Sequence, residues 1–190
     1  MKLNRNLSHY SKLYKNFLDE KTCNETIDQI KSINFQQHQF YDSKSDSMHS
    51  RSGNKELDVS WDNVKNTKFI MDKLWHQLHT YVGEFKFTWF DRWDGYTKIR
   101  FNKYSEDRKM ALHADHIKSM FDGPRKGIPV LSCLGLLNDD YEGGEFVMFD
   151  DEVIPFEQGD LLIFPSNFMY PHKVEPIKKG TRYSYISWVW

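Results

Sequence analysis

The chain has 190 residues, of which 39% are hydrophobic and 16% aromatic, and its formal net charge is −1. A chain of this length and composition is too apolar to stay disordered and long enough to bury a sizeable core in one domain. Its near-neutral charge provides no basic field that would attract nucleic acid. Two cysteines are too few for a disulfide framework, so we expect a reduced, cytoplasmic protein. Because no apolar run follows Met1 and no stretch approaches membrane-spanning length, we expect neither a signal peptide nor a membrane partner.

The first half of the chain, residues 1–95, shows helical periodicity with polar interruptions. One helix is predicted to start near Asp19 or Thr22, because either side chain can cap free N–H groups at a helix start. A second helix is predicted over residues 62–82, where apolar residues form a stripe at helical spacing. Residues 42–56 are rich in Ser, Asp, Lys and Gly and predict a loop. We expect the helices to cover one face of a sheet.

From Tyr96 onward the pattern changes to short apolar strands separated by turn residues. The predicted strands cover residues 98–104, 111–115, 130–138, 145–149, 160–164, 172–176 and 182–190. Short strands at regular spacing are typical of a sandwich or barrel. Neither an internal repeat nor a linker divides the sequence. We therefore predict a single domain over 1–190, in which 1–95 is a helical support with a loop and 96–190 is a β core.

His113-Ala114-Asp115, followed far downstream by His172, is a candidate metal site. Residues i and i+2 of a strand point to the same face, so His113 and Asp115 are expected to point together. Two imidazoles and one carboxylate bind one face of a metal ion and leave the opposite positions open, as non-haem Fe(II) oxygenases need. The His-x-Asp tripeptide also occurs by chance, and considered alone it favours a surface histidine and a turn carboxylate.

Arg182 strengthens this hypothesis, because it lies inside an aromatic strand where a charge is costly to bury unless it is paired. Its guanidinium offers a planar fork for a carboxylate, which suggests a dicarboxylic co-substrate held by the metal at one end and by Arg182 at the other. The structural alternative is an ion pair with Glu145 or Asp160. Tyr104 either donates its hydroxyl to the same carboxylate or packs in the core. Trp188 shares a strand face with Arg182 and either packs or walls the co-substrate pocket.

In this order the residues resemble the 2-oxoglutarate- and Fe(II)-dependent oxygenases, in their prolyl 4-hydroxylase-like branch. The matching strings are Phe101-Asn102-Lys103-Tyr104, His113-Ala114-Asp115, Tyr141-Glu142-Gly143-Gly144-Glu145-Phe146, Gly159-Asp160-Leu161-Leu162-Ile163-Phe164, His172-Lys173-Val174-Glu175-Pro176, Gly180-Thr181-Arg182-Tyr183-Ser184 and Trp188. These strings cover about residues 96–190. The first half resembles the branch more loosely, through Tyr14-Lys15-Asn16-Phe17-Leu18 and His49-Ser50-Arg51-Ser52.

The resemblance implies a double-stranded β-helix (jelly-roll) core with N-terminal helices packed on one sheet. It implies Fe(II) on His113, Asp115 and His172, and 2-oxoglutarate with its far carboxylate on Arg182 and Tyr104. O₂ is then the second co-substrate, and ascorbate is the expected reductant. The implied reaction is hydroxylation of a protein or peptide substrate at proline, with release of succinate and CO₂.

Two further expectations follow from the resemblance. Arg51 would lie near the peptide substrate, although a solvated loop is the simpler explanation from sequence alone. The hypoxia-sensing members carry a tyrosine where this chain has Leu136, so one hydroxyl would be missing from the co-substrate pocket. Binding of 2-oxoglutarate is then expected to be looser unless another donor such as Tyr104 suffices.

Three other functions stay open at this point. Asn102-x-Tyr104 also resembles the nucleic-acid demethylases of the same superfamily, but those enzymes usually carry a second arginine where this chain has Trp188. Hydroxylation of a free amino acid or another small molecule is the second alternative. The third is a non-catalytic jelly-roll or scaffold protein, which would need neither the metal triad nor Arg182.

Overall fold

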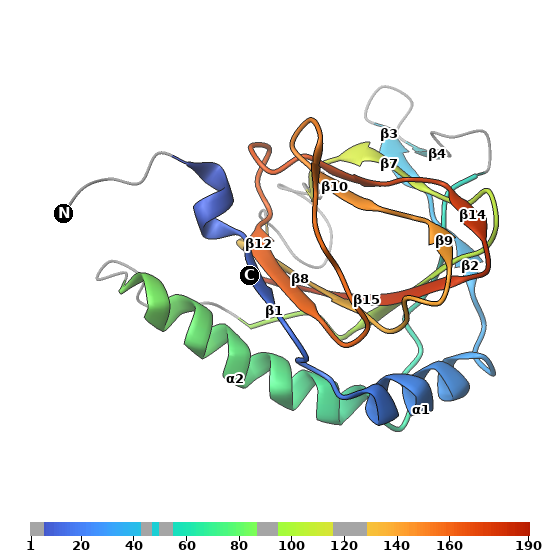
Figure 1. Cartoon of the computed structure of the whole chain (residues 1–190), viewed down its shortest axis with the longest axis horizontal. Coiled ribbons are helices and arrows are strands. Elements are labelled where there is room, and N and C mark those ends of the chain that lie inside the picture. The colour runs from blue at the N-terminus through green and yellow to red at the C-terminus, as the bar shows by residue number, and fades with distance from the viewer. Residues whose placement is uncertain (1–5, 43–46, 50–54, 87–94, 116–128) are drawn as a thin grey trace.

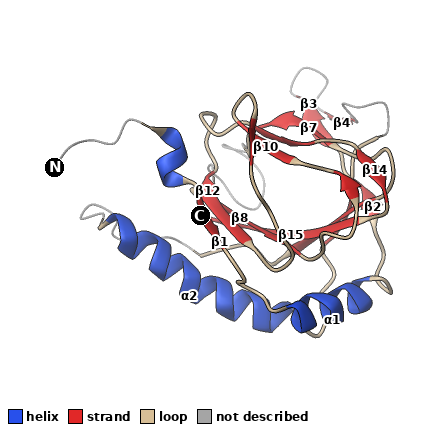
Figure 2. Ribbon diagram, viewed as in Figure 1, coloured by secondary structure: helices blue, strands red, loops and turns tan. Residues whose placement is uncertain are grey.

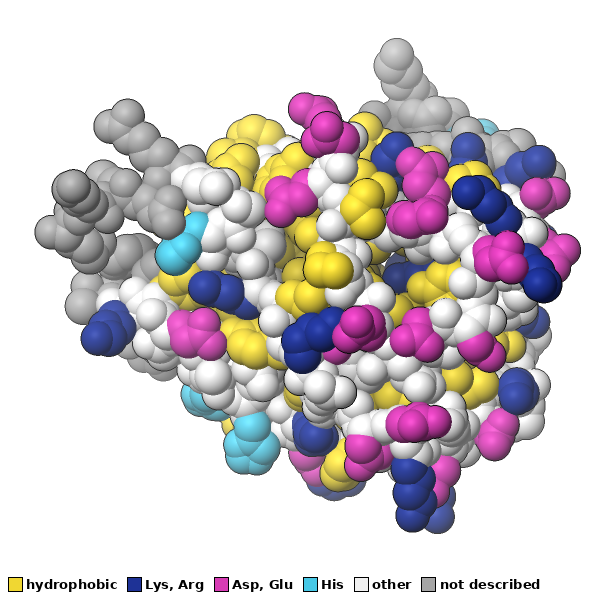
Figure 3. All heavy atoms as spheres, viewed as in Figure 1, with side chains coloured by type: hydrophobic (Ala, Val, Ile, Leu, Met, Phe, Trp, Pro, Cys, Tyr) yellow, Lys and Arg dark blue, Asp and Glu magenta, His cyan; other side chains and the backbone are white. Residues whose placement is uncertain are grey.

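The computed structural model describes residues 6–42, 47–49, 55–86, 95–115 and 129–190. Two antiparallel sheets face each other, and two helices run along the outer side of the larger sheet (Figures 1 and 2). This arrangement confirms the predicted jelly-roll core with helices packed on one sheet. None of the helices described is long and apolar enough to cross a membrane. On the face shown in Figure 3, basic and acidic side chains are interspersed, in keeping with the net charge of −1.

The larger sheet has seven strands and the smaller sheet has four. In spatial order the larger sheet is β1 (Lys12–Tyr14), β12 (Leu161–Pro165), β8 (Leu131–Leu136), β15 (Arg182–Val189), β6 (Arg100–Tyr104), β5 (Asp58–Ser60) and β2 (Gln36–Gln37). The smaller sheet is β11 (Glu152–Val153), β10 (Phe146–Met148), β13 (His172–Val174) and β7 (Met110–His113). Two short pairs join β14 (Ile177–Lys179) to β9 (Glu142–Gly143) and β3 (Phe40–Asp42) to β4 (Ser47–His49).

Helix α1 begins at a side-chain cap, and helix α2 begins after a hydrogen-bonded turn. Helix α1 (Glu20–Ile30) is capped by Asp19, whose carboxylate accepts a hydrogen bond of 2.7 Å from the Thr22 N–H. Asp19 is therefore the cap, of the two residues that the sequence offered. Helix α2 (Thr67–Phe85) starts later than the predicted residue 62. The residues before it form a turn in which the Val64 N–H donates to the Thr67 hydroxyl.

The larger sheet is buried on both faces, and alternation along β15 shows how. Tyr185 and Val189 belong to the core between the sheet and the helices, whereas Ile186 and Trp188 belong to the core between the two sheets. Side chains of a strand alternate between its faces, so Arg182 and Ser184 share the inner face with Ile186 and Trp188. Polar and charged residues on this face are thereby placed inside the jelly roll.

Periodicity misses the strands in the first half of the chain. Strands β1, β2 and β5 join the larger sheet, and β4 lies within the predicted loop 42–56. Each of these strands has two or three residues, too few to show a period of two. The same holds for β9, β11 and β14 in the second half. Part of the loop, with Arg51, lies outside the described residues.

Gly135 of β8 allows a close crossing by the buried ring of Tyr185, its partner on β15. An added Cβ at Gly135 would lie 2.1 Å from Cζ of Tyr185. We predict that Gly135→Ala lowers the free energy of unfolding by about 1–3 kcal/mol, because overpacking forces the strands to shift. The measurement is urea unfolding followed by circular dichroism. The control is Gly83→Ala in α2, where nothing lies within 4 Å and the change should add about 1 kcal/mol of stability. Equal effects of the two substitutions would contradict the packing described.

Candidate metal and co-substrate site

His113, Asp115 and His172 converge at the β7 edge of the smaller sheet. The antiparallel pairing of β13 with β7 places His172 directly opposite His113. Oδ1 of Asp115 lies 3.3 Å from Nε2 of His113 and 3.7 Å from Nε2 of His172. All three candidate ligand atoms lie within 4.8 Å of one another. The prediction that these residues meet is thus matched by the geometry.

One detail of the predicted triad is wrong. Strand β7 ends at His113, so Asp115 lies beyond the strand, whereas the sequence placed both residues in one strand over 111–115. Asp115 lies two residues beyond the end of the strand, in a segment without regular secondary structure. Its buried carboxylate is held there by a hydrogen bond of 2.6 Å from the Ser132 hydroxyl on β8.

Both imidazoles are oriented by backbone carbonyls. Nδ1 of His113 lies 2.8 Å from the carbonyl oxygen of Ala111, and Nδ1 of His172 lies 3.1 Å from that of Tyr170. When each Nδ1–H donates to its carbonyl, Nε2 keeps its lone pair for a metal ion. Metal-ligating histidines are usually held in this way, with the second ring nitrogen bound to a carbonyl or carboxylate.

The protonation states at this site suit a metal ion. Burial opposes the charged form of Asp115, but His172, His113 and the Ser132 hydroxyl favour it, and the pKa of this carboxyl lies below its usual range. Burial lowers the pKa of His172 to about 4, so its imidazole is neutral at neutral pH. Metal binding requires an ionised carboxylate and neutral imidazoles. The ring of His172 also packs against Phe146 and Phe164, at centroid distances of 5.3 Å and 5.0 Å, which shields it from water.

Arg182 is buried and lacks a partner for much of its guanidinium. It is 1% exposed, and Nη1 donates to the Ser184 hydroxyl over 3.1 Å. Nε and Nη2 have no hydrogen-bond partner among the described residues. The alternative of an ion pair with Asp160 or Glu145 does not hold in the described structure, because Asp160 binds Lys15 at 2.7 Å and neither acid pairs with Arg182. A buried guanidinium with free donors is suited to a carboxylate ligand.

A cavity of about 290 Å³ lies beside Arg182. Its lining includes Tyr141, Gly144, Phe146 and Phe156. Gly144 has a φ of +67°, and an added Cβ would lie 2.3 Å from Cδ1 of Ile177 and 3.3 Å from Cδ of Arg182. A larger residue would therefore crowd the guanidinium. The donors and the space next to them fit the far carboxylate of a small dicarboxylic acid.

Tyr104 and Trp188 occupy different places relative to Arg182. Tyr104 is the cross-strand partner of Arg182, and its ring lies 5.1 Å from Cζ of the guanidinium. Trp188 contacts Arg100 and Trp61, with its ring 4.9 Å from Cζ of Arg100. The roles of Tyr104 and Trp188 toward a co-substrate stay predictions. Arg51 lies outside the described residues.

Two features of the site extend or qualify the sequence analysis. Ser132, which holds Asp115, and Ser184, which binds Arg182, were not predicted. The sequence contained a signal for both serines, because a hydroxyl inside an apolar strand has to find a buried partner.

Leu136 is fully buried on β8, opposite Ser184 of β15. The looser 2-oxoglutarate binding expected from Leu136 stays a prediction.

Comparison with known proteins relates the part of the chain that carries this site to a protein family. Residues 99–190 match the family model of the 2OG-Fe(II) oxygenase superfamily, where 2OG is 2-oxoglutarate. This part, just under half of the chain, is similar in sequence to members of that superfamily. Fe(II), 2-oxoglutarate and O₂ are the groups that the superfamily implies. The two imidazoles and carboxylate fit Fe(II), and the unpaired donors of Arg182 fit 2-oxoglutarate.

Sequence relatives in the superfamily are PKHD-type hydroxylases. The protein from Idiomarina loihiensis is 34% identical over 95 residues, which are 48% of this chain and 41% of that protein. One from Janthinobacterium sp. is 32% identical over 95 residues, 47% of this chain and 41% of that protein. The chain thus spans about two fifths of the length of the curated relatives it matches.

Solved structures of prolyl hydroxylases share the fold. The viral collagen prolyl hydroxylase of Paramecium bursaria Chlorella virus-1, in complex with 2-oxoglutarate, has a TM-score of 0.67 at 16% identity, over 95% of this chain and 94% of that one. A prolyl hydroxylase from Trichoplax adhaerens, in complex with a peptide fragment of hypoxia-inducible factor, has a TM-score of 0.68 at 19% identity, over 95% and 83%. At such low identities the likeness establishes the fold alone.

The contact from Ser132 to Asp115 leads to a graded prediction for metal affinity. Ser132→Ala should weaken Fe(II) binding by roughly 10- to 100-fold, as loss of a partner behind a metal ligand usually does. His172→Ala should weaken it further, because a ligand is lost. The measurement is anaerobic isothermal titration with Fe(II). His76→Ala, on the exposed face of α2, is the control and should bind like the unaltered protein. Equal affinity of all four proteins would rule out this metal site.

The unpaired donors of Arg182 predict its contribution to 2-oxoglutarate affinity. In the metal-loaded protein, Arg182→Met should weaken 2-oxoglutarate binding by about 2–5 kcal/mol, the usual effect of removing one partner of a buried, hydrogen-bonded charge pair. Arg182→Lys should fall between, because it keeps the charge without the fork. Titration calorimetry measures these affinities, with the exposed Lys179→Met as control. An affinity unchanged in Arg182→Met would place 2-oxoglutarate elsewhere.

Proposed function

We propose that this chain is an Fe(II)- and 2-oxoglutarate-dependent dioxygenase that hydroxylates a substrate C–H bond, with peptidyl-proline as its substrate. The observation that carries the proposal is the pairing of two sites inside one jelly roll. A triad of His113, Asp115 and His172 lies on and beside the smaller sheet, and Arg182 of the larger sheet, buried and incompletely paired, lines a cavity. A binding module without catalysis needs neither feature.

The relatives support both the reaction and the substrate class. The sequence relatives are named hydroxylases, and the structural relatives are prolyl hydroxylases from a virus, a bacterium and an animal. One of these structures holds a peptide fragment. The assignment of a peptidyl-proline substrate to this chain is our proposal. We also propose that residues 1–190 form one cytoplasmic enzyme domain, with Arg51 on the side of the substrate.

The residues of the chain have distinct parts in the proposed reaction. Fe(II), 2-oxoglutarate and O₂, when bound, supply the oxidation of the C–H bond, with succinate and CO₂ as co-products. His113, Asp115 and His172 would hold the metal on one side and leave the other side for substrate and co-substrates. Ser132 fixes Asp115, and the backbone carbonyls fix the two imidazoles.

The co-substrate side is prepared by charge and by exclusion of water. Arg182 would orient 2-oxoglutarate through its far carboxylate, and Tyr104 lies against the guanidinium with its ring. Phe146 and Phe164 pack on His172 and keep that side of the site dry. In such a low-dielectric environment the ion pair between guanidinium and carboxylate is stronger than in water. Fixing one end of the co-substrate in this way sets the position of its metal-binding end.

The test is turnover of 2-oxoglutarate to succinate with Fe(II) and ascorbate, against proline-rich peptides, alkylated single-stranded DNA and free L-proline. We expect succinate to rise with a peptide, and the peptide to gain the mass of one oxygen on proline. His172→Ala and Arg182→Ala should lose this activity. Stimulation by alkylated DNA alone would replace the proposal by nucleic-acid demethylation. Absence of turnover, with neither Fe(II) nor 2-oxoglutarate bound, would refute the enzyme itself.

A further inference from the structure

A second buried arginine, Arg100 of β6, has no acidic partner. It is 9% exposed, and it forms no ion pair with any described carboxylate. Its Nε donates to Oδ1 of Asn102 over 3.0 Å, and its Cζ lies 4.9 Å from the Trp188 ring. The described residues give its two terminal nitrogens no hydrogen-bond partner. Burial lowers the pKa of this guanidinium below its usual value, although a guanidinium stays charged at neutral pH.

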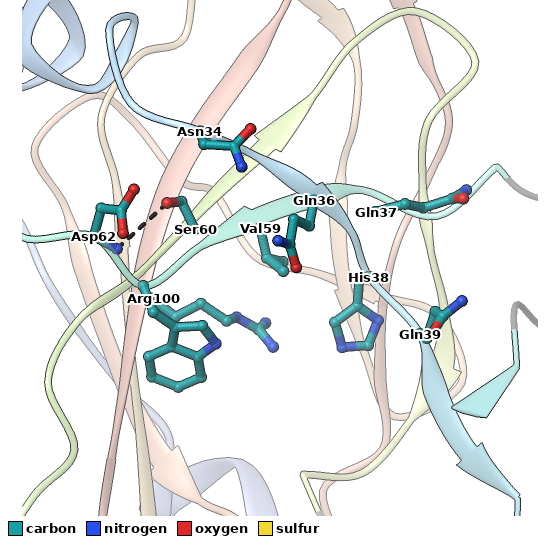
Figure 4. A pocket seen from close by; sticks show the side chains of 10 residues that line it. Asn34, Gln36, Gln37, His38, Gln39, Val59, Ser60, Asp62 and Arg100 are labelled. Atoms are coloured by element: carbon teal, nitrogen blue, oxygen red, sulfur yellow. Dashed lines mark hydrogen bonds between the residues drawn. The ribbon is translucent and has the colours of Figure 1, made fainter. Parts of the chain in front are cut away.

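Arg100 is directed into a pocket of about 460 Å³ at the edge of the larger sheet. The pocket is lined by residues in and around β2, by residues of β5 and the two that follow it, and by Arg100 at the start of β6. Figure 4 shows the guanidinium of Arg100 and the imidazole of His38 extending toward the same space, with the side chain of Gln36 beside it. Asp62 also lines the pocket but forms no ion pair with Arg100. Burial lowers the pKa of His38 to about 3, so this ring adds a polar group but no charge.

Two lines of contact join this pocket to the metal ligands. On one side, the ring of His38 packs against Phe40 at 4.9 Å, and Phe40 packs against His113 at 5.7 Å. On the other side, Trp188 lies under the guanidinium of Arg100 and pairs across the sheet with Ser132. The Ser132 hydroxyl in turn donates to Asp115. On the His38 side, a molecule in this pocket would thus be separated from the metal ligand His113 by the ring of Phe40.

The pocket of Arg100 is separate from the cavity of Arg182. Between the two guanidinium groups runs a chain of hydrogen bonds through Ser184 and Asn102. Arg182 donates to Ser184, Asn102 donates to Ser184 over 3.4 Å, and Arg100 donates to Asn102. The two cavities share none of their lining residues. Each cavity therefore presents its own cation to its own occupant.

We propose that Arg100 binds a carboxylate of the substrate and so selects substrates that carry one close to the hydroxylated carbon. This proposal rests on the proposed function, since it names a feature of the substrate of the same site. A guanidinium with two free amino groups matches the two oxygens of a planar carboxylate. A doubly charged phosphate would be only half neutralised, because His38 is neutral and no second cation lines the described pocket.

Such a carboxylate has three possible sources, and matched probes separate them. The first pair is an amidated proline peptide with Glu or Gln beside the proline. The second pair is a peptide that ends in proline as the free acid or as the amide. The third pair is L-proline and L-prolinamide. The measurement is kcat/KM for probe-stimulated succinate formation, together with the mass gain of the probe.

In the unaltered protein we expect the acid of at least one pair to exceed its neutral partner by on the order of 10- to 100-fold, the effect of roughly 1.5–3 kcal/mol for a charged hydrogen bond. In Arg100→Met this ratio should fall to about one, and Arg100→Lys should restore part of it. A general loss of folding or metal binding would lower both members of a pair and leave their ratio unchanged. Lys98→Met, which removes an exposed positive charge two residues earlier, is the control and should keep the full ratio.

Equal rates for acid and neutral partners in every pair, or an acid preference that survives in Arg100→Met, would overturn the proposal. If no probe stimulates turnover, binding is measured instead. N-acetyl-L-proline and its amide are titrated onto the anaerobic protein loaded with Fe(II) and 2-oxoglutarate. Binding of the acid alone, lost in Arg100→Met, supports the proposal, and equal or absent binding refutes it. Failure of the proposed function is recognised separately, because the unaltered protein would then neither bind 2-oxoglutarate nor form succinate under any condition.

Discussion

The register between β7 and β13 is the constraint on which the site depends. Because His172 pairs directly with His113, both imidazoles stand on the same side of the smaller sheet and meet the carboxylate that follows β7. A shift of one residue would turn one histidine to the opposite face. The backbone carbonyls of Ala111 and Tyr170 then fix the rotation of each ring. Strand pairing sets the positions of the ligands, and the chain's own hydrogen bonds set their directions.

The larger sheet holds two cationic side chains inside an apolar core. Its outer face packs on the helices through residues such as Tyr185 and Ile163, and its inner face carries Arg182 and Arg100 among apolar neighbours. Burying a guanidinium is expensive unless its donors are satisfied. Stacking on Tyr104 and on Trp188, with single hydrogen bonds to Ser184 and Asn102, stabilises the two groups only in part.

The sequence predicts the site better than it predicts the sheet that carries the site. His113, Asp115 and His172 are recognisable as a His-x-Asp motif with a downstream histidine, and Arg182 as a charge inside an apolar strand, where burial is costly unless the charge is paired. The strands of the first half are too short for periodicity, and their pairing with distant strands leaves no local signal. Asp115 lies beyond the end of β7, in a segment without regular secondary structure, and hydrophobic alternation does not predict the conformation of such a segment.

The pocket of Arg100, unlike the metal site, could not be predicted from the sequence. Arg100 stands only four positions before Tyr104 on one strand, but its pocket is built by β2 and β5 from the first half of the chain. No pattern in the sequence connects His38 with Arg100, and the sequence alone predicts no site at either residue. Only the antiparallel pairing of β5 with β6 and with β2 brings these segments together. The metal ligands are contributed by the second half of the chain alone, whereas this pocket draws on both halves.

The position of β7 at the end of the smaller sheet has a mechanical consequence. Within the described residues its only strand partner is β13, so His113 stands on an edge strand. Edge strands are held by one ladder of hydrogen bonds and open more easily than interior strands. A metal ion bound by both histidines would link β7 to β13. Its binding free energy would then stabilise the state in which the two strands are paired. Metal occupancy and the local order of the sheet edge are therefore thermodynamically linked, and each stabilises the other.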